Sequence, residues 1–143
     1  MVTVFIDGEA GTTGLGIRQR LEKHPAVQML EIDPALRKDI EARRALLHEA
    51  DIAFLCLPDA AARESAALAN GGAVRIFDAS TAHRTAPGWA YGFAELSKRH
   101  RAAIAAGNRV AVPGCHASGM IALAYPLLSA GLLPNDADLC FTS

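Results

Sequence analysis

Cys115 lies in the run "PGCHAS" (residues 113–118), between a Pro-Gly break and a stretch that can start a helix. At the first turn of a helix, free backbone N–H groups and the positive end of the helix dipole favour the thiolate, which is the nucleophilic form. We therefore predict that Cys115 is a catalytic nucleophile, the alternative being a small residue packed at a helix start. The adjacent His116 is a poor candidate for its base, because neighbouring residues there point in different directions.

The other two cysteines have different surroundings. Cys56 in "AFLCLP" and Cys140 in "DLCFTS" lie in apolar, strand-like runs, so we predict that both are inert core residues. The three cysteines are odd in number and lack C-x-x-C spacing, so we expect neither a disulfide framework nor a bound metal.

A glycine-rich run, "DGEAGTTGLG", follows the first apolar segment and opens the first helical one. Gly8, Gly11 and Gly14 are spaced three apart, which allows a tight turn and lets backbone amides approach a pyrophosphate at a helix N-terminus. The hydroxyls of Thr12 and Thr13 add donors. We predict a dinucleotide site here, although G-x-x-G-x-x-G is only a relative of the usual fingerprint.

The coenzyme's ribose would lie at the end of the second strand, where a carboxylate favours NAD and a basic group favours NADP. Glu31 and Asp33 compete there with Arg37 and Lys38, so these residues leave the choice open. A third run, "DASTAHR" (78–84), offers the Ser80 hydroxyl and the Arg84 guanidinium to an anion, but similar residues also occur in ordinary turns.

Short apolar runs alternate with helical patterns along the chain, which is typical of parallel strands joined by crossover helices. We predict an α/β fold, a Rossmann-like doubly wound parallel sheet, formed by residues 1–143 as one domain. The expected strands are 2–7, 27–33, 51–58, 73–80, 109–114 and 137–143, and the expected helices are 14–24, 35–50, 59–72, 93–108 and 116–133. Residues 81–92 are expected to form an irregular loop. In the second helix the expected apolar stripe is Leu36, Ile40, Ala42, Leu46 and Leu47.

The overall composition excludes several classes of protein. The 143 residues carry a formal net charge of −1 without a long run of one sign, so we expect no nucleic-acid partner. No apolar run approaches a membrane span, and the N-terminus has no signal-peptide pattern. We therefore expect a cytoplasmic protein without a membrane partner.

Four motifs in order, "GEAGTTG", "DASTAHR", "YGFAEL" and "VPGCHASG", resemble the semialdehyde dehydrogenase family, and within it the shorter variant of the N-acetyl-gamma-glutamyl-phosphate reductases. The resemblance implies an NADP-binding Rossmann domain, cofactor contacts by the glycine turn and Ser80, substrate binding by Arg84, and Cys115 as the nucleophile. It departs from the longer variant's N-P-G-C-Y-P-T at Val112 and after Cys115, which leaves the roles of those neighbours open.

The implied reaction is the NADPH-dependent reduction of an acyl phosphate, N-acetyl-L-glutamyl 5-phosphate, to its semialdehyde through a cysteine thioester, in arginine biosynthesis. One alternative is an aspartate-semialdehyde dehydrogenase, in which an asparagine is expected in place of Gly114. Another is a non-catalytic dinucleotide-sensing module that keeps Cys115 for packing.

The chain stops inside a strand-like run, so we expect a fragment. The resemblance places the family's catalytic histidine in a C-terminal catalytic and dimerisation domain, expected after residue 143. The 143 residues alone should bind cofactor without turnover, and the full-length protein should form a homo-oligomer.

Overall fold

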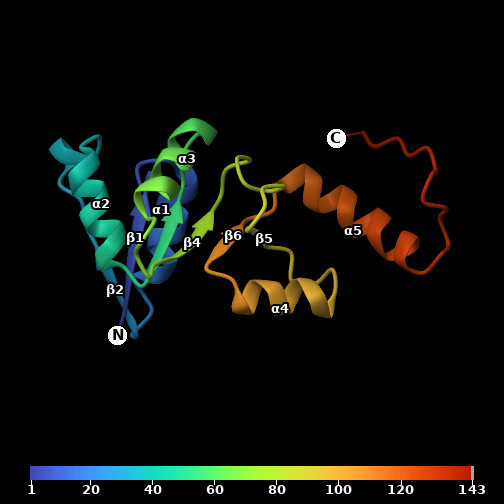
Figure 1. Ribbon diagram of the computed structural model, residues 1–143, viewed down its shortest axis with the longest axis horizontal. Coiled ribbons are helices and arrows are strands. Elements are labelled where there is room, and N and C mark those ends of the chain that lie inside the picture. Colours follow the sequence, from blue (N-terminus) through green and yellow to red (C-terminus); the bar gives the residue numbers. More distant parts are fainter. Residues whose placement is uncertain (143) are drawn as a thin grey trace.

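A computed structural model describes residues 1–142 of the chain, with strands and helices alternating along most of it (Figure 1). In chain order, the elements are β1 (Val2–Asp7), α1 (Thr12–Leu21), β2 (Val27–Leu30), the 3₁₀ turn η1 (Pro34–Leu36), α2 (Ile40–Glu49), β3 (Ile52–Leu55), α3 (Asp59–Leu68), β4 (Arg75–Asp78), β5 (Ala90–Tyr91), α4 (Lys98–Ala106), β6 (Arg109–Ala111) and α5 (Cys115–Ser129).

The strands form one parallel sheet in the order β2-β1-β3-β4-β6-β5, which confirms the predicted α/β Rossmann-like fold. From β1 the chain moves one way to β2 through α1, and then the other way to β3 through α2. Right-handed crossovers therefore place α1 and α2 on opposite faces of the sheet. This reversal makes the carboxyl ends of β1 and β3 the expected ligand crevice.

The core lies between the sheet and its helices. Val4, Phe5 and Ile6 are consecutive in β1 and all at most 2% exposed, because helices cover both faces of this strand. Leu47 of α2 and Leu55 of β3 are fully buried in the same core.

The apolar stripe predicted for the second helix is partly wrong. Leu36 and Ile40 are 45% and 46% exposed, whereas Arg43, which is not part of the expected stripe, is buried. The helix begins only at Ile40, because Asp39 caps it by accepting a hydrogen bond from the backbone N–H of Ala42 at 2.8 Å. Leu36 therefore belongs to the separate turn η1.

Two further expectations were wrong. The expected loop 81–92 contains the short strand β5, which adds to the sheet edge by pairing with β6. Residues 137–142 form no strand, and Ser143 of the same expected run lies outside the described residues. Cys140 is therefore exposed instead of lying in a core strand.

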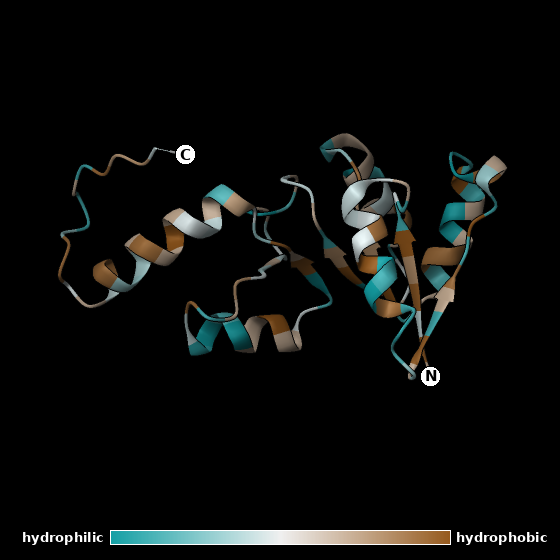
Figure 2. Cartoon of the chain, turned by 180° about the vertical axis from the view of Figure 1, so that it is seen from behind, coloured by the Kyte–Doolittle hydropathy of each residue, from teal (hydrophilic) through white to brown (hydrophobic). Residues whose placement is uncertain are grey.

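Helix α5 projects from the sheet, and apolar residues alternate along it with more polar ones (Figure 2). None of its residues is buried. One side of α5 meets α4, where the rings of Tyr125 and His100 lie edge-on with centroids 5.8 Å apart, whereas Leu123 and Leu127 of the same helix are exposed. Within residues 1–142, no helix is both long enough and apolar enough to cross a membrane.

Candidate functional site

The glycine turn joins β1 to α1 at the crevice, and its three glycines have different surroundings. Gly8 has φ +89°, and a Cβ there would lie 2.8 Å from the carbonyl carbon of Cys56. At Gly14, a Cβ would lie 2.7 Å from Cα of Glu9. These two glycines are required by the protein's own packing.

Gly11 is open on the side where a Cβ would point, with only the Gly8 carbonyl oxygen nearby, at 3.6 Å. It is the N-cap of α1 and has no side-chain capping bond. The first-turn N–H groups, including those of Thr12 and Thr13, have no partner within the helix. The absence of a side chain at Gly11 leaves a cradle suited to a phosphate, so these residues fit the pyrophosphate of a dinucleotide.

A small pocket, which we call the α1 pocket, lies between the ends of β1, β3 and β4. Its lining residues are Gly11, Thr12, Thr13, Cys56, Leu57 and Ala79. Cys56, expected in the core, is only half-buried here. Burial, together with the nearby carboxylates of Asp7 and Asp78, raises the pKa of its thiol to about 11. Cys56 therefore stays protonated near neutral pH.

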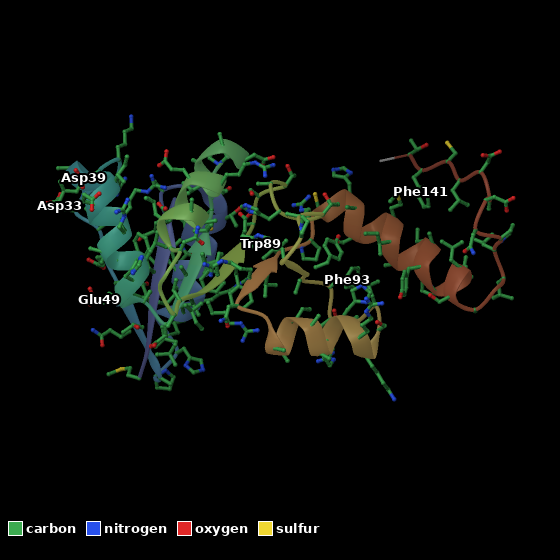
Figure 3. All side chains as sticks on the ribbon, viewed as in Figure 1. Asp33, Asp39, Glu49, Trp89, Phe93 and Phe141 are labelled. Atoms are coloured by element: carbon green, nitrogen blue, oxygen red, sulfur yellow. The ribbon has the colours of Figure 1, made fainter. Side chains whose placement is uncertain are left out.

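A second cleft, which we call the β2 cleft, lies where the coenzyme's ribose was expected. Glu31 and Arg37 line it together with Glu9 and Arg18. Asp33 is instead used by η1, where it accepts a hydrogen bond from the N–H of Ala35 at 2.8 Å. Figure 3 shows Asp33 at the N-terminal end of α2.

Arg18 is held by three carboxylates, which the sequence reasoning missed although its spacing of four from Glu22 is a helix-pair signal. Its partners are Glu9 at 2.6 Å, Glu22 at 2.5 Å, and Glu31. Hydrogen bonds with Glu31, Glu22 and Glu9, in that order, raise the pKa of Arg18. Glu31 therefore faces the β2 cleft already paired with a cation.

Below the glycine turn, Asp7 and Arg43 form a buried ion pair. The Asp7 carboxylate accepts hydrogen bonds from Nε and Nη2 of Arg43 at 3.1 and 2.9 Å and from the Ser65 hydroxyl at 2.6 Å. Burial alone would lower the pKa of Arg43, but its bonds with Asp7 and Glu64 outweigh that effect and raise it. The pair fastens α2 and α3 to the strand that carries the turn.

Ser80 and Arg84, predicted as ligand contacts, follow β4 at the same sheet edge. The Ser80 hydroxyl is buried and donates to Asp78 at 2.7 Å. Its cofactor role stays a prediction. In the structure the hydroxyl bonds within its own loop, since it also accepts a hydrogen bond from the Ala82 N–H at 3.1 Å. Arg84 Nε donates to the Val112 carbonyl oxygen at 3.1 Å, which joins the loop to the segment before Cys115.

Cys115 is the first residue of α5 and is exposed, as predicted for a presented cysteine. Gly114 is the N-cap, and a Cβ there would lie 2.9 Å from Cζ of Arg84. The missing side chain lets the guanidinium lie against the helix start, one residue before the cysteine. An asparagine at this position would have to displace Arg84.

The "YGFAEL" run supports the same corner of the sheet. Gly92 donates its N–H to the Ala111 carbonyl oxygen at 2.8 Å, and a Cβ on it would lie 2.9 Å from that oxygen. This close approach fixes β5 beside the end of β6, just before Pro113. The DASTAHR, YGFAEL and VPGCHASG motifs, which are separate in the sequence, therefore lie next to one another at the ends of β4 and β6.

The sheet topology, the glycine turn and the α1 pocket define a nicotinamide-dinucleotide-binding domain of the Rossmann type. The family model for "Semialdehyde dehydrogenase, NAD binding domain" matches residues 33–104. The chain belongs to the semialdehyde dehydrogenase family. This matched range contains the Asp78–Arg84 loop, but neither the glycine turn nor Cys115.

Curated relatives extend the similarity over nearly the whole chain. The chain is 56% identical over 133 residues to N-acetyl-gamma-glutamyl-phosphate reductase of Chelativorans sp. (strain BNC1), covering 93% of the chain and 43% of that relative. It is 51% identical over 136 residues to N-acetyl-gamma-glutamyl-phosphate reductase 2 of Pseudomonas putida, covering 95% and 44%. The chain thus spans less than half the length of these relatives.

Among solved structures, aspartate semialdehyde dehydrogenase from Francisella tularensis has a TM-score of 0.66 at 15% identity, covering 92% of this chain and 42% of that chain. Aspartate semialdehyde dehydrogenase II from Vibrio cholerae has a TM-score of 0.61 at 18% identity, covering 91% and 47%. At such low identity these likenesses show the fold alone.

Proposed function

We propose that the full-length protein is an NADPH-dependent reductase that converts N-acetyl-L-glutamyl 5-phosphate to N-acetyl-L-glutamate 5-semialdehyde and phosphate, in arginine biosynthesis. The observation that carries the proposal is that Arg84 lies against the residue before an exposed helix-start cysteine, Cys115. A cation beside a thiol suits attack on a substrate whose leaving group is an anion. The curated relatives named for this reaction support the choice of substrate.

In the proposed reaction, the Cys115 thiolate attacks the carbonyl carbon of the acyl phosphate. The bond between this carbon and the oxygen that bridges it to phosphorus breaks. The departing phosphate takes up the one proton that the reaction consumes. NADPH, when bound, supplies the hydride that reduces the resulting thioester to a thiohemiacetal. The C–S bond then breaks, the aldehyde leaves, and Sγ of Cys115 regains its electron pair. Arg84 would hold the phosphate during the first step.

We further propose that Gly11, Thr12 and Thr13 hold the coenzyme's pyrophosphate, with Gly8 and Gly14 shaping the turn and Ser80 contributing near the nicotinamide. A second domain would follow residue 143, because the curated relatives are far longer than the segment they share with this chain. The full-length protein would be a cytoplasmic homo-oligomer without a nucleic-acid or membrane partner.

The test is a turnover assay on the full-length protein, run in the oxidative direction. With N-acetyl-L-glutamate 5-semialdehyde and NADP⁺, NADPH should form only when phosphate is present, because phosphate must cleave the thioester. Aspartate semialdehyde, at equal concentration, should give much slower turnover. NADPH formation without phosphate, a preference for aspartate semialdehyde, or coenzyme binding without any turnover would each contradict the proposal.

The preference for NADPH would come from Arg37. Arg18 neutralises Glu31 in the β2 cleft, whereas none of the ion pairs within residues 1–142 includes Arg37. An unpaired guanidinium in this cleft is available for the coenzyme's 2′-phosphate.

Arg37→Gln should weaken NADPH binding by about tenfold or more, the loss expected for one hydrogen bond to a charged group. NADH binding should be unchanged, since NADH lacks the 2′-phosphate. Fluorescence titration of both coenzymes measures this, with Arg20→Gln, an exposed change outside the cleft, as the control. Equal weakening of both coenzymes would refute the role of Arg37.

A further inference from the structure

A single buried carboxylate organises the loop that leads from β4 to Arg84. Asp78 is 0% exposed and accepts hydrogen bonds from the Ser80 N–H at 2.9 Å and the Ser80 hydroxyl at 2.7 Å. Its Oδ2 also lies 2.6 Å from Nδ1 of His83. An ionised carboxylate has only acceptor oxygens, so in a hydrogen bond of this pair Nδ1–H of His83 donates to Asp78. The loop is thus fixed from Ser80 to His83.

His83 is itself held on a second side. The residue is only 7% exposed, and its ring stacks on Trp89, with centroids 4.0 Å apart and planes 9° from parallel. Trp89 lies near the middle of the molecule, between the sheet and α5 (Figure 3). The imidazole therefore has both its plane and one ring nitrogen fixed, and the next residue, Arg84, leaves the loop in a defined direction.

The contacts of Arg84 close a ring. Arg84 Nε donates to the Val112 carbonyl oxygen at 3.1 Å, and the Val112 N–H donates to the Asp78 carbonyl oxygen at 2.8 Å. The guanidinium then lies over Gly114, beside the first residue of α5. Asp78 is therefore linked to Arg84 both through the loop and across the sheet.

We propose that Asp78 and His83 are positioning residues that hold the Arg84 guanidinium beside Cys115, so that the cysteine lies next to a fixed positive charge. Their value for catalysis rests on the proposed function, in which Cys115 attacks a phosphorylated substrate. The placement of the charge is a property of this chain and needs no turnover to be measured.

The experiment compares two alkylating reagents of similar size, iodoacetate, which is an anion, and iodoacetamide, which is neutral. Peptide mass spectrometry gives the rate at each cysteine, and the iodoacetate/iodoacetamide ratio at Cys115 is divided by that at Cys140, the other exposed cysteine. A positive charge at close range should favour the anion, and we expect a normalised ratio of about five. A ratio near one would overturn the proposal.

Arg84→Gln should bring the normalised ratio to about one, and His83→Phe should do the same, since phenylalanine keeps the stacking on Trp89 but cannot donate to Asp78. In the Arg84→Gln background, His83→Phe should cause no further fall, and slow labelling of Cys56 in every variant would show that the lower ratio does not come from unfolding. Retention of the full ratio in His83→Phe, with loss in Arg84→Gln, would overturn the positioning role.

Two controls keep the result interpretable. Cys56 is half-buried, and the pKa of its thiol is raised to about 11, so it reacts slowly while the chain is folded. Its continued slow labelling therefore reports that each variant is folded. Arg99→Gln removes an exposed arginine of α4 and should leave the ratio unchanged.

If His83→Phe fails to fold, Trp89→Leu is measured in its place, and it must lower the ratio for the proposal to stand. A failure of turnover with these ratios intact would refute the proposed function alone.

Discussion

Cys115→Ser in the full-length protein is expected to lower phosphate-dependent turnover by at least about 10³-fold, as for other enzymes that lose their nucleophile. Serine preserves the size and position of the side chain, but its hydroxyl is a far weaker nucleophile than a thiolate and a poorer leaving group from the tetrahedral intermediate. NADPH binding should change little, because Cys115 is not among the residues lining the α1 pocket or the β2 cleft.

Steady-state turnover and coenzyme titration on the same preparations test this prediction. Cys140→Ser is the matched control, since Cys140 is also exposed but begins no helix; its turnover should stay within about twofold of the parent, as expected for a surface change. If Cys115→Ser keeps more than a tenth of the activity, Cys115 is not the nucleophile. If it also loses NADPH, the variant has lost structure and reports nothing specific about chemistry.

The sequence predicted the sheet well because parallel strands have a strong local signature. Runs such as residues 2–7 are apolar on both faces, and glycine-rich or amphipathic segments separate them. The short strand β5 lacks this signature. Ala90 and Tyr91 become a strand only because β6, nearly twenty residues later, offers a free edge to pair with. Pairing at a sheet edge depends on tertiary structure that local patterns do not contain.

Buried polar residues were the other failure of prediction. Arg43 lies in a helix rich in charged residues, and nothing local distinguishes it from Arg44, which is exposed. Its burial is possible because Asp7, 36 residues earlier, accepts two of its hydrogen bonds. Asp78 is similar, since an aspartate after a strand resembles an ordinary turn residue until His83 and Val112 are placed around it. A buried charge is determined by its partner, and the partner is distant in sequence.

The glycine turn gives the second large effect, since Gly8→Ala is expected to destabilise the chain by about 2–6 kcal/mol. The substitution forces alanine into φ +89° and drives its Cβ against the backbone of Cys56. Neither part can be relieved cheaply, because Gly8 directly follows Asp7, which is anchored by Arg43. Urea unfolding followed by circular dichroism measures the free energy of unfolding.

Gly71→Ala separates the two causes of the loss expected at Gly8, which are backbone strain and the clash of the new Cβ with Cys56. Gly71 has φ +83°, almost the same backbone strain, yet nothing lies within 4 Å of where its Cβ would be. It should cost only the conformational part, about 1–3 kcal/mol. Gly11→Ala, with φ −79° and an open Cβ direction, should cost less still. Equal losses at Gly8 and Gly71 would mean that β1 and β3 do not approach each other closely at the turn. A larger loss at Gly8 means that the crevice is set by packing before any coenzyme binds, which leaves Gly11 as the glycine whose absent side chain serves the ligand.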